Sequence, residues 1–165
     1  MREKCGLMIS QTAQLIRNMA CIAVFASLAG GCASQPTVTP PRTSSAAQKA
    51  AAVAIQQVGV RYRYGGASPG GFDCSGLMHY AYASAGKRIP RTTAAQWDAM
   101  RPVAKHDLRV GDILFFKIAG KVSHVGMYVG GGEFVHAPST GSVVSIASLR
   151  SEFYQDAYIR AGRPD

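Results

Sequence analysis

The chain has 165 residues, of which 47% are apolar, and it carries a formal net charge of +9. The length suggests one domain with appendages, and the apolar content excludes a largely disordered protein. The basic residues are scattered and no helix-turn-helix, zinc-finger or RNA-binding pattern accompanies them, so we expect no nucleic-acid partner.

Residues 1–31 have the pattern of an export signal. A basic lead precedes an apolar run at 19–29, which is too short to span a bilayer comfortably, and small residues close the run. This end resembles the bacterial lipoprotein box, which would make Cys32 the lipidated first residue. By the same resemblance, a residue other than aspartate after that cysteine, here Ala33, implies an anchor at the periplasmic face of the outer membrane. An ordinary signal peptide cleaved near the same place would instead leave Cys32 free.

Residues 32–45 are rich in proline, serine and threonine and are predicted to form an extended linker. A polyproline-like linker would span on the order of 40 Å at ~3.1 Å per residue, which suits a tether between a lipid anchor and a domain working away from the membrane. Without the signal the chain would keep a charge of about +7. In an exported protein, this charge favours an anionic envelope polymer or a lipid surface as the partner.

The predicted folded domain, residues 46–165, begins with helical patterns. The helices are expected over 46–58 after a cap at Ser44 or Ser45, from Cys74 to a stop at Gly86 after a cap at Asp73, and through Met100 after a cap at Thr92 or Thr93. Before the second helix, large side chains alternate and then meet paired glycines, which allow a sharp turn or a close approach to a ligand. Residues 67–71 are predicted to continue as a loop.

The second half of the domain changes to a period of two residues, which predicts strands. They are expected at 112–116, 124–129, 133–136, 143–146 and 157–160, with a short helix over 149–153. The glycines at 130–132 predict a tight hairpin between the second and third strands. Helices followed by an antiparallel meander indicate an α+β fold, with the helices packed on one face of the sheet.

Cys74 is the only cysteine of the predicted domain, because the other three fall in the signal or at its end. With no partner for an intramolecular disulfide in an exported protein, it is a candidate reactive thiol. Its place in the first turn of a helix suits a nucleophile, since unpaired N–H groups and the helix dipole favour the thiolate. The alternative is a small buried packing residue.

The glycine hairpin brings two histidines together. His124 and His136 lie ~6 residues on either side of the first glycine, so antiparallel pairing places both at one end of the sheet. If the Cys74 helix begins over that end, the site holds a thiol, a base in His124 and an orienting group in His136, as thiol acyl transfer needs. A zinc site competes, although a fourth ligand is not apparent. Two ordinary hydrogen-bonded histidines are the remaining alternative.

Six motifs of the domain resemble, in order, those of the NlpC/P60 cysteine peptidases. They occupy 62–66, 72–77, 90–96, 109–116, 123–128 and 133–137. The resemblance covers roughly residues 46–160 and implies a papain-like α+β fold. It also implies a peptidoglycan endopeptidase that acts on stem peptides through a thioester, without a cofactor or metal. The bond cut would be D-glutamyl–diaminopimelate within a stem peptide or D-alanyl–diaminopimelate in a cross-link.

The resemblance also implies roles for single residues. The implied catalytic residues are Cys74 as nucleophile, His124 as base, His136 as the third polar residue and Tyr62, whose hydroxyl would lie near the oxyanion. Asp73 and Ser75 match positions that help to hold the stem peptide, although Asp73 could be a helix cap alone and Tyr62 a half-buried aromatic. Another thiol amidase or acyltransferase on the same fold, or a non-catalytic wall-binding lipoprotein, remain alternatives.

Overall fold

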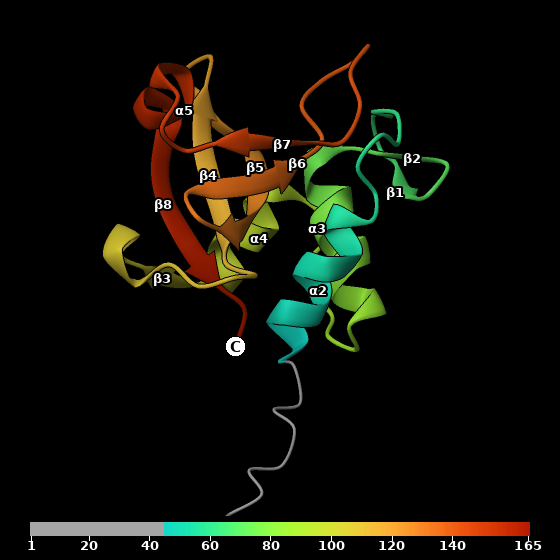
Figure 1. Cartoon of the computed structure of the whole chain (residues 1–165), viewed down its shortest axis with the longest axis horizontal. Coiled ribbons are helices and arrows are strands. Elements are labelled where there is room, and N and C mark those ends of the chain that lie inside the picture. Colours follow the sequence, from blue (N-terminus) through green and yellow to red (C-terminus); the bar gives the residue numbers. More distant parts are fainter. Residues whose placement is uncertain (1–44) are drawn as a thin grey trace, which may run out of the picture. The chain divides into compact units, whose positions relative to one another are not determined.

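The computed structural model describes residues 45–165 (Figure 1). The predicted signal at 1–31 and the lipidation position Cys32 lie outside the described residues, as does the linker up to residue 44. Within 45–165, none of the helices combines the length and the apolar character that a membrane span requires. Element labels follow Figure 1.

Three helices come first, and their caps are the predicted ones. They are α2 (Ala46–Ile55), α3 (Cys74–Ser84) and α4 (Thr93–Ala99). Ser45 caps α2 in a capping box with Gln48, Asp73 caps α3, and Thr92 caps α4. Each cap is a short polar side chain that accepts a bond from an otherwise unpaired helix amide, which is why the sequence located these starts correctly. A fourth helix, α5 (Glu152–Ala157), starts later than predicted.

The strands form a six-stranded antiparallel sheet in the order β3-β8-β4-β5-β6-β7. The bounds are β3 (Arg101–Val103), β4 (Ile113–Ile118), β5 (Lys121–Gly130), β6 (Glu133–His136), β7 (Ser145–Ser148) and β8 (Tyr158–Arg163). The meander of β4 to β7 is as predicted, but β8 inserts between β3 and β4. A 3₁₀ turn, η1 (Lys105–Asp107), connects β3 to β4.

Three strands were absent from the sequence prediction. The predicted loop at 67–71 contains a small hairpin of β1 (Ala67–Ser68) and β2 (Gly71–Phe72), which is too short to leave a periodic pattern. β3 has Pro102 at its centre, and proline is confined to edge strands such as this one. The predicted strand at 143–146 starts late, at β7, because Val143 pairs instead with Arg61 in an isolated bridge.

Alternate residues of β4 divide the core between the two faces of the sheet. Ile113 and Phe115 pack in the cluster that includes α2 and α3, and Trp97 of α4 packs edge-on against Phe115. Leu114 and Phe116 point the other way, into a cluster covered by α5. Helices α2 to α4 therefore lie on one face, as predicted, and the short α5 covers the other (Figure 1).

Candidate active site

Asp73 fixes the start of α3. Its carboxylate accepts a 2.7 Å bond from the Gly76 amide, as an N-cap does, and a 3.0 Å bond from the Gly65 amide. Cys74 is therefore the first residue of the helix, as predicted. The fit at this turn is tight, because a Cβ on Gly76 would lie 2.0 Å from the Gly66 carbonyl oxygen.

Arg91 completes the environment of this carboxylate. Its guanidinium donates to both oxygens of Asp73, at 2.9 and 2.7 Å, and to the Ser75 hydroxyl at 3.1 Å. Burial raises the pKa of Asp73, but the bonds from Arg91 and the Gly76 amide outweigh it, so the net pKa is below its usual value. The buried carboxylate accepts five hydrogen bonds from the protein itself. The stem-peptide contacts of Asp73 and Ser75 remain predictions.

The hairpin of β5 and β6 brings the two histidines together, but in a different register from the one expected. The turn is centred on 131–132, where both φ angles are positive, and the strands pair Met127 with Val135. A hairpin centred on the first glycine would pair Met127 with residue 133, so the observed register is shifted by two residues. His124 and His136 are therefore diagonal neighbours on one face of the sheet, rather than directly opposite.

A β-bulge lies directly before His124. The ladder with β4 passes from His124 to Val122 without a partner for Ser123, which is an extra residue in β5. Bulges of this kind bend a strand and re-aim its side chains. Here the Ser123 carbonyl lies 3.9 Å from the Cys74 sulfur, so the bulge brings β5 against the start of α3.

His124 and His136 form a buried, hydrogen-bonded pair. His124 Nε2 and His136 Nδ1 are 2.9 Å apart, and the two side chains belong to residues only 5% and 2% exposed. Burial and the neighbouring His136 lower the pKa of His124 to about 3, and burial lowers the pKa of His136 to about 4. Both imidazoles are therefore neutral near pH 7. Because Nε2 of His124 faces His136, Nδ1 is the nitrogen left to accept a proton.

Cys74 is half-buried beside the peptide that precedes His124. Its Sγ is 3.9 Å from both the Ser123 carbonyl oxygen and the Thr93 hydroxyl, and no hydrogen bond joins it to His124 within residues 45–165. Burial raises the pKa of the Cys74 thiol more than bonds from the Val125 backbone and Thr93 lower it. The Ser75 amide at the helix start also lowers this pKa, as expected, but burial outweighs it, so the thiol rather than the thiolate is favoured. The resting site holds a neutral thiol and a neutral imidazole.

An open groove of about 510 Å³ leads to the sulfur. Tyr62 lines it, together with Asp73 and Ser75, and Tyr62 also lines a second hollow of about 450 Å³ beside Arg61. Burial raises the pKa of the Tyr62 hydroxyl, so it remains a proton donor. All the predicted site residues of the folded domain are therefore found around one groove or in the histidine pair behind it.

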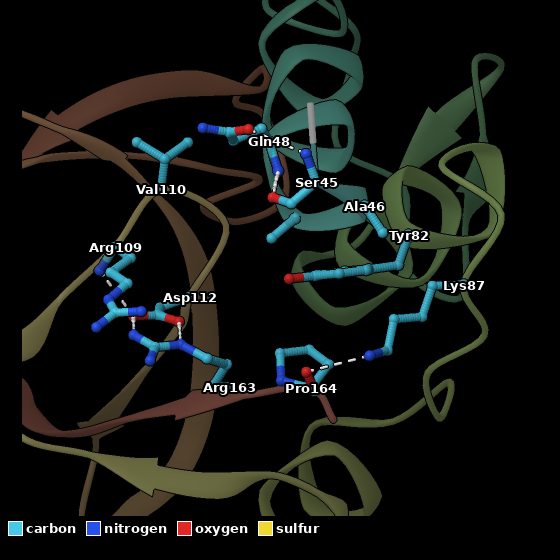
Figure 2. A pocket seen from close by; sticks show the side chains of 11 residues that line it. Ser45, Ala46, Gln48, Tyr82, Lys87, Arg109, Val110, Asp112, Arg163 and Pro164 are labelled. Carbon is cyan, nitrogen blue, oxygen red and sulfur yellow. Dashed lines mark hydrogen bonds and ion pairs between the residues drawn. The ribbon is translucent and has the colours of Figure 1, made fainter. Parts of the chain in front are cut away.

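Another hollow, of about 530 Å³, lies beside the start of α2 (Figure 2). Arg163 makes two bonds of 2.7 Å to the Asp112 carboxylate, and Lys87 donates to the Pro164 carbonyl at 3.2 Å. The Tyr82 hydroxyl in the same view donates to a backbone carbonyl at 2.7 Å. None of the candidate catalytic residues lines this hollow, so the chemistry belongs to the groove at Cys74.

Three functional side chains of the 90–96 motif had no assigned role. Arg91 contacts Asp73, Thr93 contacts Cys74, and Gln96 donates to the Ser75 carbonyl at 3.0 Å. Their partners lie 18, 19 and 21 positions away in the chain, so no local spacing signals the contacts. The one available signal was the run of polar residues at the start of a short helix.

Comparisons with known proteins indicate one protein family for this chain. Residues 59–163 match the NlpC/P60 family model. The chain is 45% identical over 127 residues to the murein DD-endopeptidase MepH of Escherichia coli, covering 70% of this chain and 46% of that protein. It is 41% identical over 101 residues to the gamma-D-glutamyl-L-lysine dipeptidyl-peptidase of Bacillus subtilis, covering 59% and 34%. The chain thus spans less than half of the length of each of these two curated relatives.

Solved structures agree with the fold. An NlpC/P60 family protein from Bacillus cereus superposes with a TM-score of 0.67 at 36% identity, over 71% of this chain and 39% of that one. The NlpC/p60 domain of the peptidoglycan hydrolase SagA gives a TM-score of 0.62 at 32% identity, over 71% of this chain and 97% of that one. The predicted α+β, papain-like architecture is confirmed by these likenesses.

Proposed function

This chain belongs to the NlpC/P60 family, and from that premise we propose that it is a peptidoglycan endopeptidase with a Cys-His-His mechanism. One arrangement carries the proposal. Cys74 begins a capped helix at the end of an open groove, beside the peptide that precedes His124, and His124 is bonded at 2.9 Å to His136. A nucleophile, a base and an orienting group are the parts that thiol acyl transfer needs.

In this mechanism, His124 Nδ1 takes the thiol proton as the Cys74 sulfur attacks the scissile carbonyl carbon. The sulfur–carbon bond forms and the carbonyl electron pair moves to oxygen. The intermediate then collapses, the carbon–nitrogen bond breaks, and His124 gives its proton to the leaving amine. Water hydrolyses the thioester with His124 again as base, and the bond to His136 keeps the ring oriented throughout.

Two donors are available for the oxyanion. The backbone N–H of Cys74 makes no hydrogen bond to any residue of 45–165, and the Tyr62 hydroxyl lines the same groove. Donors placed before the reaction stabilise the developing charge without reorganising, which is often the largest catalytic contribution. We therefore assign Tyr62 and the first amide of α3 to the oxyanion.

Two bonds fit the relatives' names. A murein DD-endopeptidase name fits cleavage of the D-alanyl–diaminopimelate cross-link. A second relative from Escherichia coli, at 39% identity, is named both a murein DD-endopeptidase and a murein LD-carboxypeptidase. The dipeptidyl-peptidase of Bacillus subtilis is named for a gamma-D-glutamyl bond within the stem. The higher identity favours the cross-link as the first bond to test.

The test is mass analysis of purified peptidoglycan after incubation with the protein. Loss of cross-linked dimers identifies the cross-link, and shortened stem peptides identify the D-glutamyl bond. Release of whole stem peptides would indicate an amidase, and masses gained by transfer would indicate an acyltransferase. Cys74→Ala should abolish the products while the protein still binds peptidoglycan. Products that persist in Cys74→Ala would refute the thiol mechanism, and wild-type binding without products would support the wall-binding alternative.

The proposal also covers where in the cell envelope the protein is held. The support is the sequence of the signal and of Cys32, together with the basic charge, which suits an anionic wall polymer or lipid surface. We propose a lipid anchor at Cys32 that holds the domain at the periplasmic face of the outer membrane, with the linker giving it reach.

A further inference from the structure

Two side chains of the segment 90–96 clamp the residues on either side of the candidate nucleophile. Arg91 holds both oxygens of Asp73, at 2.9 and 2.7 Å. Gln96 is completely buried, and its amide donates to the Ser75 carbonyl at 3.0 Å. The segment is therefore fixed against the first turn of α3 by two independent anchors.

Thr93 lies between these anchors, and its hydroxyl faces the sulfur. Thr93 Oγ1 is 3.9 Å from Cys74 Sγ, within reach of a hydrogen bond to sulfur. The preceding Thr92 already caps α4, since its hydroxyl accepts a bond from the Ala95 amide at 3.3 Å. The Thr93 hydroxyl is thus not used as a cap, and within residues 45–165 the sulfur is its hydrogen-bond partner.

Resting on the proposed function, we propose that Thr93 is a further catalytic residue, whose hydroxyl donates a hydrogen bond to the Cys74 sulfur and stabilises the negative charge it gains. A hydroxyl is a donor and an acceptor, so its proton can turn toward the sulfur when the thiol proton leaves for His124. Hydrogen bonds to a charged acceptor are about twice as strong as neutral ones. The bond therefore strengthens as the reaction starts.

The backbone of Val125 and Ser75 also lowers the pKa of the thiol by hydrogen bonding, but the other side chains at the sulfur do not supply this donation. The charged and titratable groups that act on it are Asp73 with its partner Arg91, and Tyr62 in the preceding loop, while His124 follows the Ser123 carbonyl on β5. The carboxylate disfavours a thiolate, the Ser123 carbonyl can only accept, and burial disfavours charge as well. Thr93 is thus the side chain, within the described residues, that hydrogen-bonds to the sulfur as a donor to its charged form.

The experiment compares Thr93→Val with Thr93→Ser and a matched control, Thr140→Val. Valine keeps the shape of threonine without the hydroxyl, serine keeps the hydroxyl, and Thr140 is an exposed threonine outside the groove. The rate of Cys74 alkylation by iodoacetamide is followed from pH 5 to 10 by mass spectrometry of the Cys74 peptide, because the chain contains other cysteines. Peptidoglycan hydrolysis is measured in parallel.

Thr93→Val should raise the pH midpoint of alkylation and lower kcat about tenfold with KM unchanged. Thr93→Ser should restore both to within about twofold of wild type, and Thr140→Val should match wild type. Melting temperatures are measured for all variants. An unchanged alkylation profile in Thr93→Val would overturn the proposal. So would a loss of activity in both Thr93 variants that follows a loss of melting temperature, since that marks a packing role.

The two readouts separate this inference from the proposed function. Alkylation needs no substrate. A shifted midpoint in Thr93→Val, with no peptidoglycan hydrolysis by the wild type, would refute the endopeptidase and leave the hydrogen bond to sulfur in place. Hydrolysis that is normal in the wild type and unaffected in Thr93→Val would refute the role of Thr93 and leave the endopeptidase in place.

Discussion

At the scale of single residues, the site depends on polar groups that are neutral because they are buried. The thiol of Cys74 has a raised pKa, and the imidazoles of His124 and His136 have pKa values lowered to about 3 and about 4. A charge in such surroundings costs free energy unless it is paired. Proton transfer from the Cys74 sulfur to His124 creates two charges, so it is favoured by groups that stabilise those charges. Mutating the neighbouring hydrogen-bond donors therefore tests the mechanism.

Tyr62→Phe tests the oxyanion donor. The change deletes one hydroxyl and leaves the ring that lines the groove. Loss of one oxyanion donor should lower kcat on the order of 10²-fold with little change in stability. Steady-state kinetics on purified peptidoglycan fragments checks this. A rise confined to KM would place Tyr62 in substrate binding instead.

His136 variants test the orienting role. His136→Ala removes the partner of His124 Nε2, yet the base itself remains, so the loss should be milder than in His124→Ala. Asparagine or glutamine at 136 can still accept a hydrogen bond and should restore part of the activity. The readout is kcat/KM for the three His136 variants and His124→Ala at one pH. Alanine and asparagine variants of equal activity would contradict an orienting hydrogen bond.

At the scale of elements, the capped start of α3 makes the stability of the fold depend on pH. Asp73 has a lowered pKa in the fold, so its ionised form stabilises the protein above its unfolded pKa of about 3.9. This contribution to stability is lost as the pH falls below the unfolded pKa of Asp73 and through its folded pKa. The bond from Arg91 is a main cause of the lowering, which makes the arginine the residue to change.

Arg91→Gln should therefore shrink the loss of unfolding free energy between pH 5 and pH 3, while lowering stability at pH 7. Urea unfolding at each pH measures this. Arg101→Gln is the matched control, because its pair with Asp165 is 3.6 Å long and more than half exposed on both sides, where ion pairs contribute little. A pH dependence equal to wild type in Arg91→Gln would show that Arg91 does not hold the Asp73 charge.

Element starts and residue types were predictable from the sequence, whereas contacts between distant segments were not. Capping residues and the glycine hairpin act locally, so Asp73, Thr92 and the β5–β6 turn could be located from a few neighbours. The contact of Thr93 with Cys74 and the bulge at Ser123 depend on how elements pack. The protonation state of the Cys74 thiol could not be predicted for the same reason, because the burial that raises its pKa depends on how the whole fold packs.

At the scale of the whole molecule, the sheet lies between the helix that carries the candidate nucleophile and the side chains that enclose the histidine pair. One face carries α2 to α4 and so holds Cys74, while the histidines project toward the other face, where Phe116, Phe134 and Tyr154 enclose them. The Cys74 sulfur lies 3.9 Å from the carbonyl of Ser123, the extra residue that directly precedes His124. The nucleophile thus faces an open groove, and the base is shielded from water on its far side.

The proposed anchor is tested by Cys32→Ser. The variant should carry no lipid and should fractionate as a soluble protein or an unprocessed precursor, because the acyl chains would be its main hold on the membrane. Metabolic labelling with a fatty acid and membrane fractionation measure this against wild type. Wild-type protein without label, and a variant that stays in the outer-membrane fraction, would contradict a lipid anchor.

The insertion of β8 between β3 and β4 has a consequence for biosynthesis. β3 and β4 do not pair with each other, so the sheet stays in two parts until residues 158–163 have left the ribosome. Such long-range strand pairing is slow. The proposed export can thus begin before the fold is complete. The groove of the proposed hydrolase is therefore expected to be complete only after residues 158–163 have been synthesised.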